Sequence, residues 1–224
     1  MLLARYAPDG TLDPTFGTNG IATANVGLPS IGYAAALQRS GRIVVAGSFI
    51  TISTNEPALV GFDPDGHVDE RFGDHGVVTF DLGDQALFYG LVTTPDDGLI
   101  AATSDALRRV DADGRHDPTF HGDTLGYPFT VSSLAVQDDG RLLVSGTARA
   151  PNDASDGFYV ARLHPDGTID PTFGAEGFAI TRTLFITDGA RSFVALQPDG
   201  DPVVAAVLPR ERADLLLLRY HGGP

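Results

Sequence analysis

The residues most able to do chemistry are aspartates that recur at a fixed spacing around a glycine. The pattern D-x-D-G-x-x-D is complete twice, at Asp63, Asp65 and Asp69 and again at Asp111, Asp113 and Asp117. Calcium loops place oxygen ligands at alternate positions, with a glycine at the sharp turn. The spacing therefore allows a calcium site at either copy.

A structural interpretation competes with the calcium site. The carboxylate that normally opens a calcium loop is missing, because Gly61 and Arg109 stand in its place. Ala7 and His164 break the pattern in two further copies. In a Pro-Asp-Gly turn the aspartate accepts hydrogen bonds from nearby backbone N–H groups. We expect turn aspartates with no metal and no cofactor, and we keep calcium as the alternative.

An arginine stands at one equivalent position, eight residues before the last aspartate of the motif. The pairs are Arg5 with Asp13, Arg109 with Asp117 and Arg162 with Asp170, and Arg219 occupies the same position near the C-terminal end. A cross-turn ion pair that orients the turn is the simplest account. A ring of arginines lining an anion channel is the alternative. The second copy has Gly61 opposite Asp69 and lacks this arginine.

The elements that must position these residues repeat about every 50 residues. The motif occurs at Ala7–Gly17, Asp63–Gly73, Asp111–His121 and His164–Gly174, and a second turn recurs at residues 39–41, 96–98, 138–140 and 198–200. Asp-Gly between apolar runs predicts a tight hairpin, because glycine accepts the positive φ that the turn requires. Each unit should therefore hold four strands, a to d, with the second turn joining a to b and the motif joining c to d.

This organisation predicts an all-β fold. A period near 50 residues made of short strands is typical of a β-propeller blade. We expect one domain over residues 1–224, with repeats at about 2–57, 58–106, 107–157 and 158–215 and a terminal strand at 216–224. The expected architecture is a β-propeller of four four-stranded blades. Residues 11–24 could complete the last blade as a velcro closure, and an open arc or half of a larger propeller is the alternative.

The repeat resembles a known family. A-R-Y-A-P-D-G-T-L-D-P-T-F-G at residues 4–17 and A-L-Q-P-D-G at residues 195–200 match the composite motif of the bacterial delta-60 repeat. That resemblance covers essentially the whole chain and implies a β-propeller, with a more distant likeness to the NHL class of propeller. It implies bacterial proteins that are often secreted or attached to the cell envelope, and no established reaction.

Composition narrows the classes of function. The 224 residues carry 29 acidic and 15 basic side chains, a net charge of −14, and no cysteine. An acidic surface repels phosphate backbones, so nucleic acid is not an expected partner. Without cysteine the chain has no disulfides, thiolate metal sites or cysteine nucleophiles. No apolar run reaches the roughly 18 residues of a membrane span, so membrane insertion is not expected.

The start of the chain bears on its location. No signal peptide precedes the first repeat, which predicts a cytoplasmic protein as the chain stands. If the chain is part of a longer exported protein, the family resemblance favours the cell envelope or secretion. Residues 2–6 and residues 215–220 both fit the c position of the same blade, so one strand is surplus. A surplus strand also allows a homodimer through unpaired terminal strands.

The connections that differ between copies are the expected binding surface. Both recurrent turns fall on one face of a propeller, so the b–c and d–a loops share the opposite face, and function in repeat folds tends to lie on variable loops. The candidates are Asn55, Glu56, Tyr127, Arg149, Asp153, Asp156, Arg182, Asp188, Arg210, Glu211 and Arg212. No catalytic residue can be assigned, because no nucleophile, zinc or phosphate-loop pattern is present.

Two classes of function compete. The first is a non-catalytic binding or structural repeat module that presents these loops to a protein or glycan partner. The alternative is a propeller enzyme, a metal-assisted lactonase or lyase with a site at the channel mouth. The enzyme hypothesis rests on fold analogy alone. We favour the binding or structural module.

Overall fold

The computed structural model describes residues 1–24, 29–50, 55–82, 87–103, 106–123, 125, 129–148, 157–182, 190–208 and 214–220. Within them the regular elements are strands: β1 Leu2–Ala4, β2 Ile21–Thr23, β3 Ser30–Leu37, β4 Ile43–Ile50, β5 Asn55–Phe62, β6 Val77–Thr79, β7 Gly90–Thr93, β8 Leu99–Ala102, β9 Leu107–Val110, β10 Phe129–Val136, β11 Leu142–Ala148, β12 Gly157–Leu163, β13 Phe178–Arg182, β14 Arg191–Leu196, β15 Pro202–Leu208 and β16 Asp214–Arg219. A search of the same residues for a helix long and apolar enough to cross a membrane finds none.

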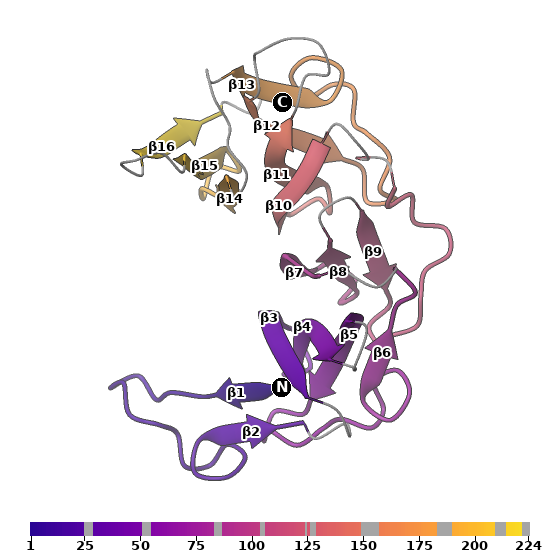
Figure 1. The fold of residues 1–224 in the computed structure, drawn as a ribbon, viewed down its shortest axis with the longest axis vertical. Helices are drawn as coiled ribbons and strands as arrows, with labels where there is room; N and C mark the ends of the chain where they lie inside the picture. The colour runs from indigo at the N-terminus through magenta and orange to yellow at the C-terminus, as the bar shows by residue number, and fades with distance from the viewer. Residues whose placement is uncertain are drawn as a thin grey trace. The chain divides into compact units, whose positions relative to one another are not determined.

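The strands form small sheets whose order follows the chain (Figure 1). Two sheets have four strands, β3-β4-β5-β6 and β10-β11-β12-β13; two have three, β7-β8-β9 and β14-β15-β16; and β1 pairs with β2 alone. The pairings for which the register is resolved are all antiparallel. Consecutive up-and-down strands of this kind are propeller blades. The all-β propeller prediction is therefore confirmed, with the a, b, c and d strands in the predicted order.

The two N-terminal strands pair with each other. β2 pairs with β1, with Leu3 opposite Ala22. β16 pairs with β15 and is the outer strand of its three-stranded sheet. Residues 11–24, which the sequence allowed as a velcro strand for the last blade, thus contribute β2 to this N-terminal pair.

The chain divides into two compact units. The first holds Met1–Ala101 with Val110–Asp117, and the second holds Ala102–Arg109 with Pro118–Pro224. In each unit the core lies between successive sheets. The second unit buries Leu143 and Val160 against Val194 and Val204 of the following sheet.

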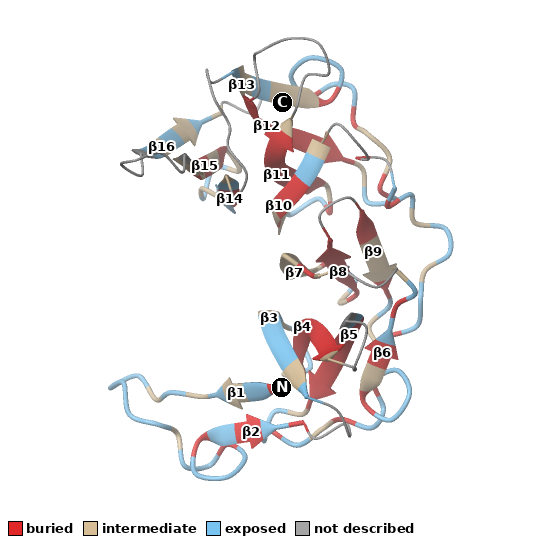
Figure 2. Cartoon of the chain, viewed as in Figure 1, coloured by how far each residue is buried: buried red, intermediate tan, exposed pale blue. Residues whose placement is uncertain are grey.

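The b strands β4, β8 and β11 are buried on both faces. β4 is buried throughout except at its two ends, Ile43 and Ile50, and β11 is buried from Leu142 to Thr147. The neighbouring c strand β12 is buried along its whole length (Figure 2). Sheets covered on both faces are what a stack of blades requires.

Candidate functional site

The aspartates of the calcium-like pattern hold their own turns. Asp63 Oδ1 accepts hydrogen bonds from the backbone N–H groups of Asp65 (3.0 Å) and His67 (2.8 Å). Asp111 Oδ1 accepts the equivalent bonds from Asp113 (2.9 Å) and Arg115 (2.8 Å). These are the bonds expected of turn aspartates.

The same carboxylates do not gather around a common point. Among the described residues no group of three or more histidine, aspartate or glutamate side chains is arranged to hold a metal ion. Asp69, the third carboxylate of the first complete pattern, is instead bound by two guanidinium groups, those of Arg42 and Arg71.

The predicted cross-turn ion pairs are present in the first and fourth copies. Arg5 Nε lies 2.9 Å from Asp13 Oδ2, and Arg162 Nε lies 2.7 Å from Asp170 Oδ2. The two pairs differ in burial: the side chains of Arg162 and Asp170 are 3% and 2% exposed, those of Arg5 and Asp13 36% and 27%. The prediction of an arginine–aspartate pair is confirmed at both positions.

Each of these guanidinium groups also lies over the phenylalanine that ends its own motif copy. The distance from Cζ to the ring centroid is 4.6 Å for Arg5 over Phe16 and 5.0 Å for Arg162 over Phe173. A cation over an aromatic face is attracted by the quadrupole of the ring. The arginine, aspartate and phenylalanine that recur in the motif thus form one packed cluster.

In the second copy a different arginine supplies the missing charge. Gly61 stands where the motif arginine would be, and Arg42, from the start of strand b, donates from Nε to Asp69 Oδ2 at 2.7 Å. Its Cζ lies 5.5 Å from the centroid of the Phe72 ring. Phe72 fills the space at Gly61, since a Cβ on Gly61 would lie 2.8 Å from the Phe72 Cβ. The sequence indicated the gap at Gly61 but not its compensation by Arg42.

The arginines also bind the next copy of the repeat. Each donates to the carbonyl oxygen that precedes the turn aspartate: Arg5 to Pro64 O at 2.6 Å, Arg42 to Ala112 O at 2.7 Å and Arg109 to Pro165 O at 3.3 Å. Arg42 therefore replaces the motif arginine in both of its roles, toward its own turn and toward the following copy.

At each of three junctions, a backbone hydrogen bond joins the end of one motif copy to the turn of the next copy. The residue after the phenylalanine donates its N–H to the carbonyl of the next turn aspartate: Gly17 to Asp65 O at 2.6 Å, Gly73 to Asp113 O at 2.8 Å and His121 to Asp166 O at 2.8 Å. Gly114 shows how close the contact is, because a Cβ there would lie 2.9 Å from Gly73 N and its φ is +84°. The repeated motif is thus the connection between successive blades.

The carboxylates in these clusters are held ionised. Burial alone would raise the pKa of Asp170, but hydrogen bonds from Thr172 and the Arg162 guanidinium outweigh it and hold that pKa well below its usual range. Hydrogen bonds from Arg71, and then from Arg42, likewise hold the pKa of Asp69 well below its usual range against the opposing effect of burial. Charges paired in this way are characteristic of structural networks as well as of active sites.

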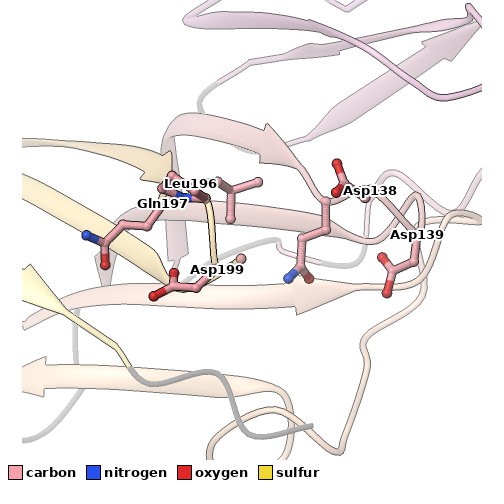
Figure 3. A pocket seen from close by; sticks show the side chains of 8 residues that line it. Asp138, Asp139, Leu196, Gln197 and Asp199 are labelled. Atoms are coloured by element: carbon pink, nitrogen blue, oxygen red, sulfur yellow. The ribbon is translucent and has the colours of Figure 1, made fainter.

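Two surface hollows lie beside the turns. The larger, of about 360 Å³, is lined by Gln137, Asp138, Asp139, Leu196, Gln197, Pro198, Asp199 and Gly200. Figure 3 shows Asp138 and Asp139 on one a–b turn and Gln197 and Asp199 on the next. The smaller, of about 330 Å³, is lined by Gly73, Asp74, Val77, Val78, Thr79, Gly114, Arg115 and His116.

The lining of the larger hollow consists mainly of hydrogen-bond acceptors. The side-chain oxygens of Gln137 and Gln197 are buried and have no hydrogen-bond partner among the described residues. The equivalent Gln38 instead uses its amide to bind the following blade, donating to Asp97 O at 2.7 Å and Ala112 O at 2.9 Å. Amide and carboxylate oxygens can accept bonds from hydroxyl or ammonium groups, so this hollow suits polar groups. Sequence reasoning assigned these turns to the scaffold and did not single them out.

Most of the predicted loop residues lie outside the described residues. These are Tyr127, Arg149, Asp153, Asp156, Asp188, Arg210, Glu211 and Arg212. Of the others, Asn55 begins β5, where it pairs with Ile50, and Glu56 follows it as an exposed residue opposite Phe49. Arg182 ends β13 and is exposed.

Comparison with known proteins supports the same fold. A family model described as a domain of unknown function (DUF5122) beta-propeller matches residues 1–16, 38–72 and 137–173. No curated protein matches the sequence significantly. The matched stretches contain the first, second and fourth copies of the motif except for their final glycines.

Solved structures resemble the chain at low sequence identity. A protein of unknown function from Bacteroides caccae has a TM-score of 0.50 and 13% identity, over 96% of this chain and 72% of that one. An extracellular domain from B. thetaiotaomicron has a TM-score of 0.47 and 14% identity, over 90% of this chain and only 22% of that one. A gluconolactonase from Xanthomonas campestris has a TM-score of 0.49 and 16% identity, over 88% of this chain and 60% of that one. The observed sheets and the match to the family model together make this chain a β-propeller protein.

Proposed function

We propose that this chain is a non-catalytic binding or structural repeat module of the delta-60 type, which presents its variable b–c and d–a loops to a protein or glycan partner. The observation that carries this proposal is the use of the recurrent charged groups. Arg5 and Arg162 are each bonded to an aspartate of their own copy, and Arg42 is bonded to Asp69 of the second copy. Arg5 and Arg42 also reach the copy that follows. Groups used in this way hold the scaffold, which leaves the variable loops for recognition.

The competing enzyme hypothesis needs a different arrangement. A metal-assisted lactonase or lyase requires carboxylates or histidines that converge on one point. In the described part of the chain, such a group of three or more is not found. The likeness to a gluconolactonase extends to the fold only, because fold does not specify function.

The loops can be tested against the turns directly. Binding of the wild-type protein would first be measured on arrays of glycans and of cell-envelope proteins. Binding to the same arrays would then be measured for the triple variant Arg149→Ala, Asp153→Ala, Asp156→Ala. We expect this variant to weaken binding about tenfold or more. Asp138→Ala with Asp199→Ala, on the turn face, serves as the control and should leave binding unchanged. Loss of binding in the turn variant, with the loop variant unaffected, would overturn the assignment of the loop face.

A further inference from the structure

Successive blades pack through two different faces. In the first unit, Val44 and Leu59 of sheet β3–β6 lie against Phe88 and Leu99, which follow them in the chain. The opposite face of the same sheet, which includes Val60 and Phe62, lies against the preceding pair β1–β2 through Phe16 and Ala22. The c strand β5 therefore turns alternate side chains toward the preceding and the following blade.

The sheet β14–β15–β16 has one of these faces uncovered. The register places Val207 between Arg191 and Leu215, Ala205 between Phe193 and Leu217, and Val203 between Ala195 and Arg219. We call its apolar residues the C-terminal face: Phe193, Ala195, Val203, Ala205, Val207, Leu215 and Leu217. The other face of this sheet is the one packed on the preceding blade, through Val194, Val204 and Leu218.

Residues on the C-terminal face are highly exposed, whereas the residues at equivalent positions of other blades are buried. Leu217 is 68% exposed, whereas Val160 and Leu59, at the same position of their c strands, are fully buried. Leu215 is 74% exposed, whereas the equivalent Phe158 is fully buried. These are residues whose counterparts contact a following blade.

The pair β1–β2 leaves the opposite face uncovered. We call it the N-terminal face: Leu2, Ala4, Tyr6, Leu12 and Ile21, in which Ala4 pairs with Ile21 and Tyr6 with Leu12. Tyr6 is 64% exposed, whereas the equivalent Phe62, Val110 and Leu163 are fully buried. Phe62 and Val110 lie on the face that a preceding blade covers.

The turn of the first copy shows the same difference. A Cβ on Gly66, Gly114 or Gly167 would lie about 3 Å from atoms of the preceding copy, whereas a Cβ on the equivalent Gly10 would meet nothing within 4 Å. The turn of the first copy thus has the same backbone geometry as the other turns, but no other copy packs against its glycine. Contiguous exposed apolar side chains are typical of an interaction site.

We infer that the N-terminal face of one molecule packs on the C-terminal face of a second copy of this chain. The two faces are the two halves of a contact that already recurs between blades inside the molecule, so the association continues an existing interface. Because the faces differ, the contact is head-to-tail, in which each copy uses both faces. This association involves sheet faces rather than strand edges and does not depend on the proposed loop function.

Three substitutions at comparably exposed residues test the inference. Tyr6→Asp disables the N-terminal face and Leu217→Asp the C-terminal face, while Leu37→Asp, at a 65% exposed leucine on neither face, is the control. Circular dichroism confirms that each variant folds. Sedimentation velocity over a concentration series then measures self-association. We expect wild type and Leu37→Asp to associate and each face variant to associate at least ~100-fold more weakly, because a charge would be buried in the contact.

The decisive step is to mix the two face variants. A head-to-tail contact needs one intact face of each kind, so Tyr6→Asp and Leu217→Asp together should form a one-to-one complex although each alone is monomeric. A wild type that stays monomeric, a face variant that still associates like wild type, or a mixture that stays monomeric would each overturn the inference.

Discussion

Replacing Asp170 with alanine is expected to lower the free energy of unfolding by about 3–5 kcal/mol, because it leaves a buried charge without its partner. Arg162 is only 3% exposed and donates to Asp170 from Nε at 2.7 Å. The substitution also removes the acceptor for the Thr172 backbone N–H and hydroxyl. Chemical denaturation followed by circular dichroism measures the loss.

The matched control lies at the same motif position in the first copy. Asp13 makes the same bonds, to Arg5 and to the N–H and hydroxyl of Thr15, but both charged side chains are more than a quarter exposed. Water can solvate Arg5 when Asp13 is removed, so Asp13→Ala should cost far less than Asp170→Ala. Equal losses from the two variants would show that burial is not what gives the pair its strength.

The difference in stability between wild type and Asp170→Ala should depend on pH. The pKa of Asp170 is lowered in the folded protein, so below the ordinary aspartate pKa of about 4 the unfolded state binds a proton that the folded state does not. The stabilisation is therefore fully present at neutral pH and is lost as the pH falls below about 4. The difference between wild type and Asp170→Ala should shrink over that window. A difference that stays constant down to pH 3 would contradict this origin.

Arg42→Ala is expected to lower the free energy of unfolding by about 2–4 kcal/mol, because several buried bonds end on one guanidinium. Arg42 donates to Asp69, to the side chain of Gln38 at 3.2 Å and to Ala112 O of the next copy. Asp69 keeps its bonds from Arg71, which limits the loss. The measurement is again chemical denaturation.

Arg141 is the control for Arg42, because it follows the equivalent turn. Its side chain is 29% exposed and its main partner is the exposed Asp139, while Asp170, 3.4 Å away, retains Arg162. Arg141→Ala should therefore cost at most about 1 kcal/mol. If the two variants lost the same stability, the assigned role of Arg42 as a replacement for the motif arginine would be wrong.

Much of this architecture could be predicted from the sequence because the motif occurs four times, so each interpretation could be compared between copies. Apolar runs separated by Asp-Gly turns predicted the strands and their order, and Arg5 with Asp13 identified the ion pair. Arg42 was not found, because its partners Asp69 and Ala112 are 27 and 70 residues away in sequence. The uncovered faces could not be predicted either, since Tyr6 and Leu217 have the same apolar character as their buried counterparts. Only the packing of neighbouring sheets distinguishes them.

The central claim is that the repeated motif joins successive blades. Native-state hydrogen exchange at the amides of Gly73 and His121 tests it most directly, since each donates across a junction, to Asp113 O and Asp166 O. Gly73 lies in a turn and His121 lies outside the strands, where exchange is ordinarily fast. We predict protection close to that of the buried strands β4 and β11. Exchange at the rate of an exposed amide, with β4 and β11 still protected, would contradict the claim.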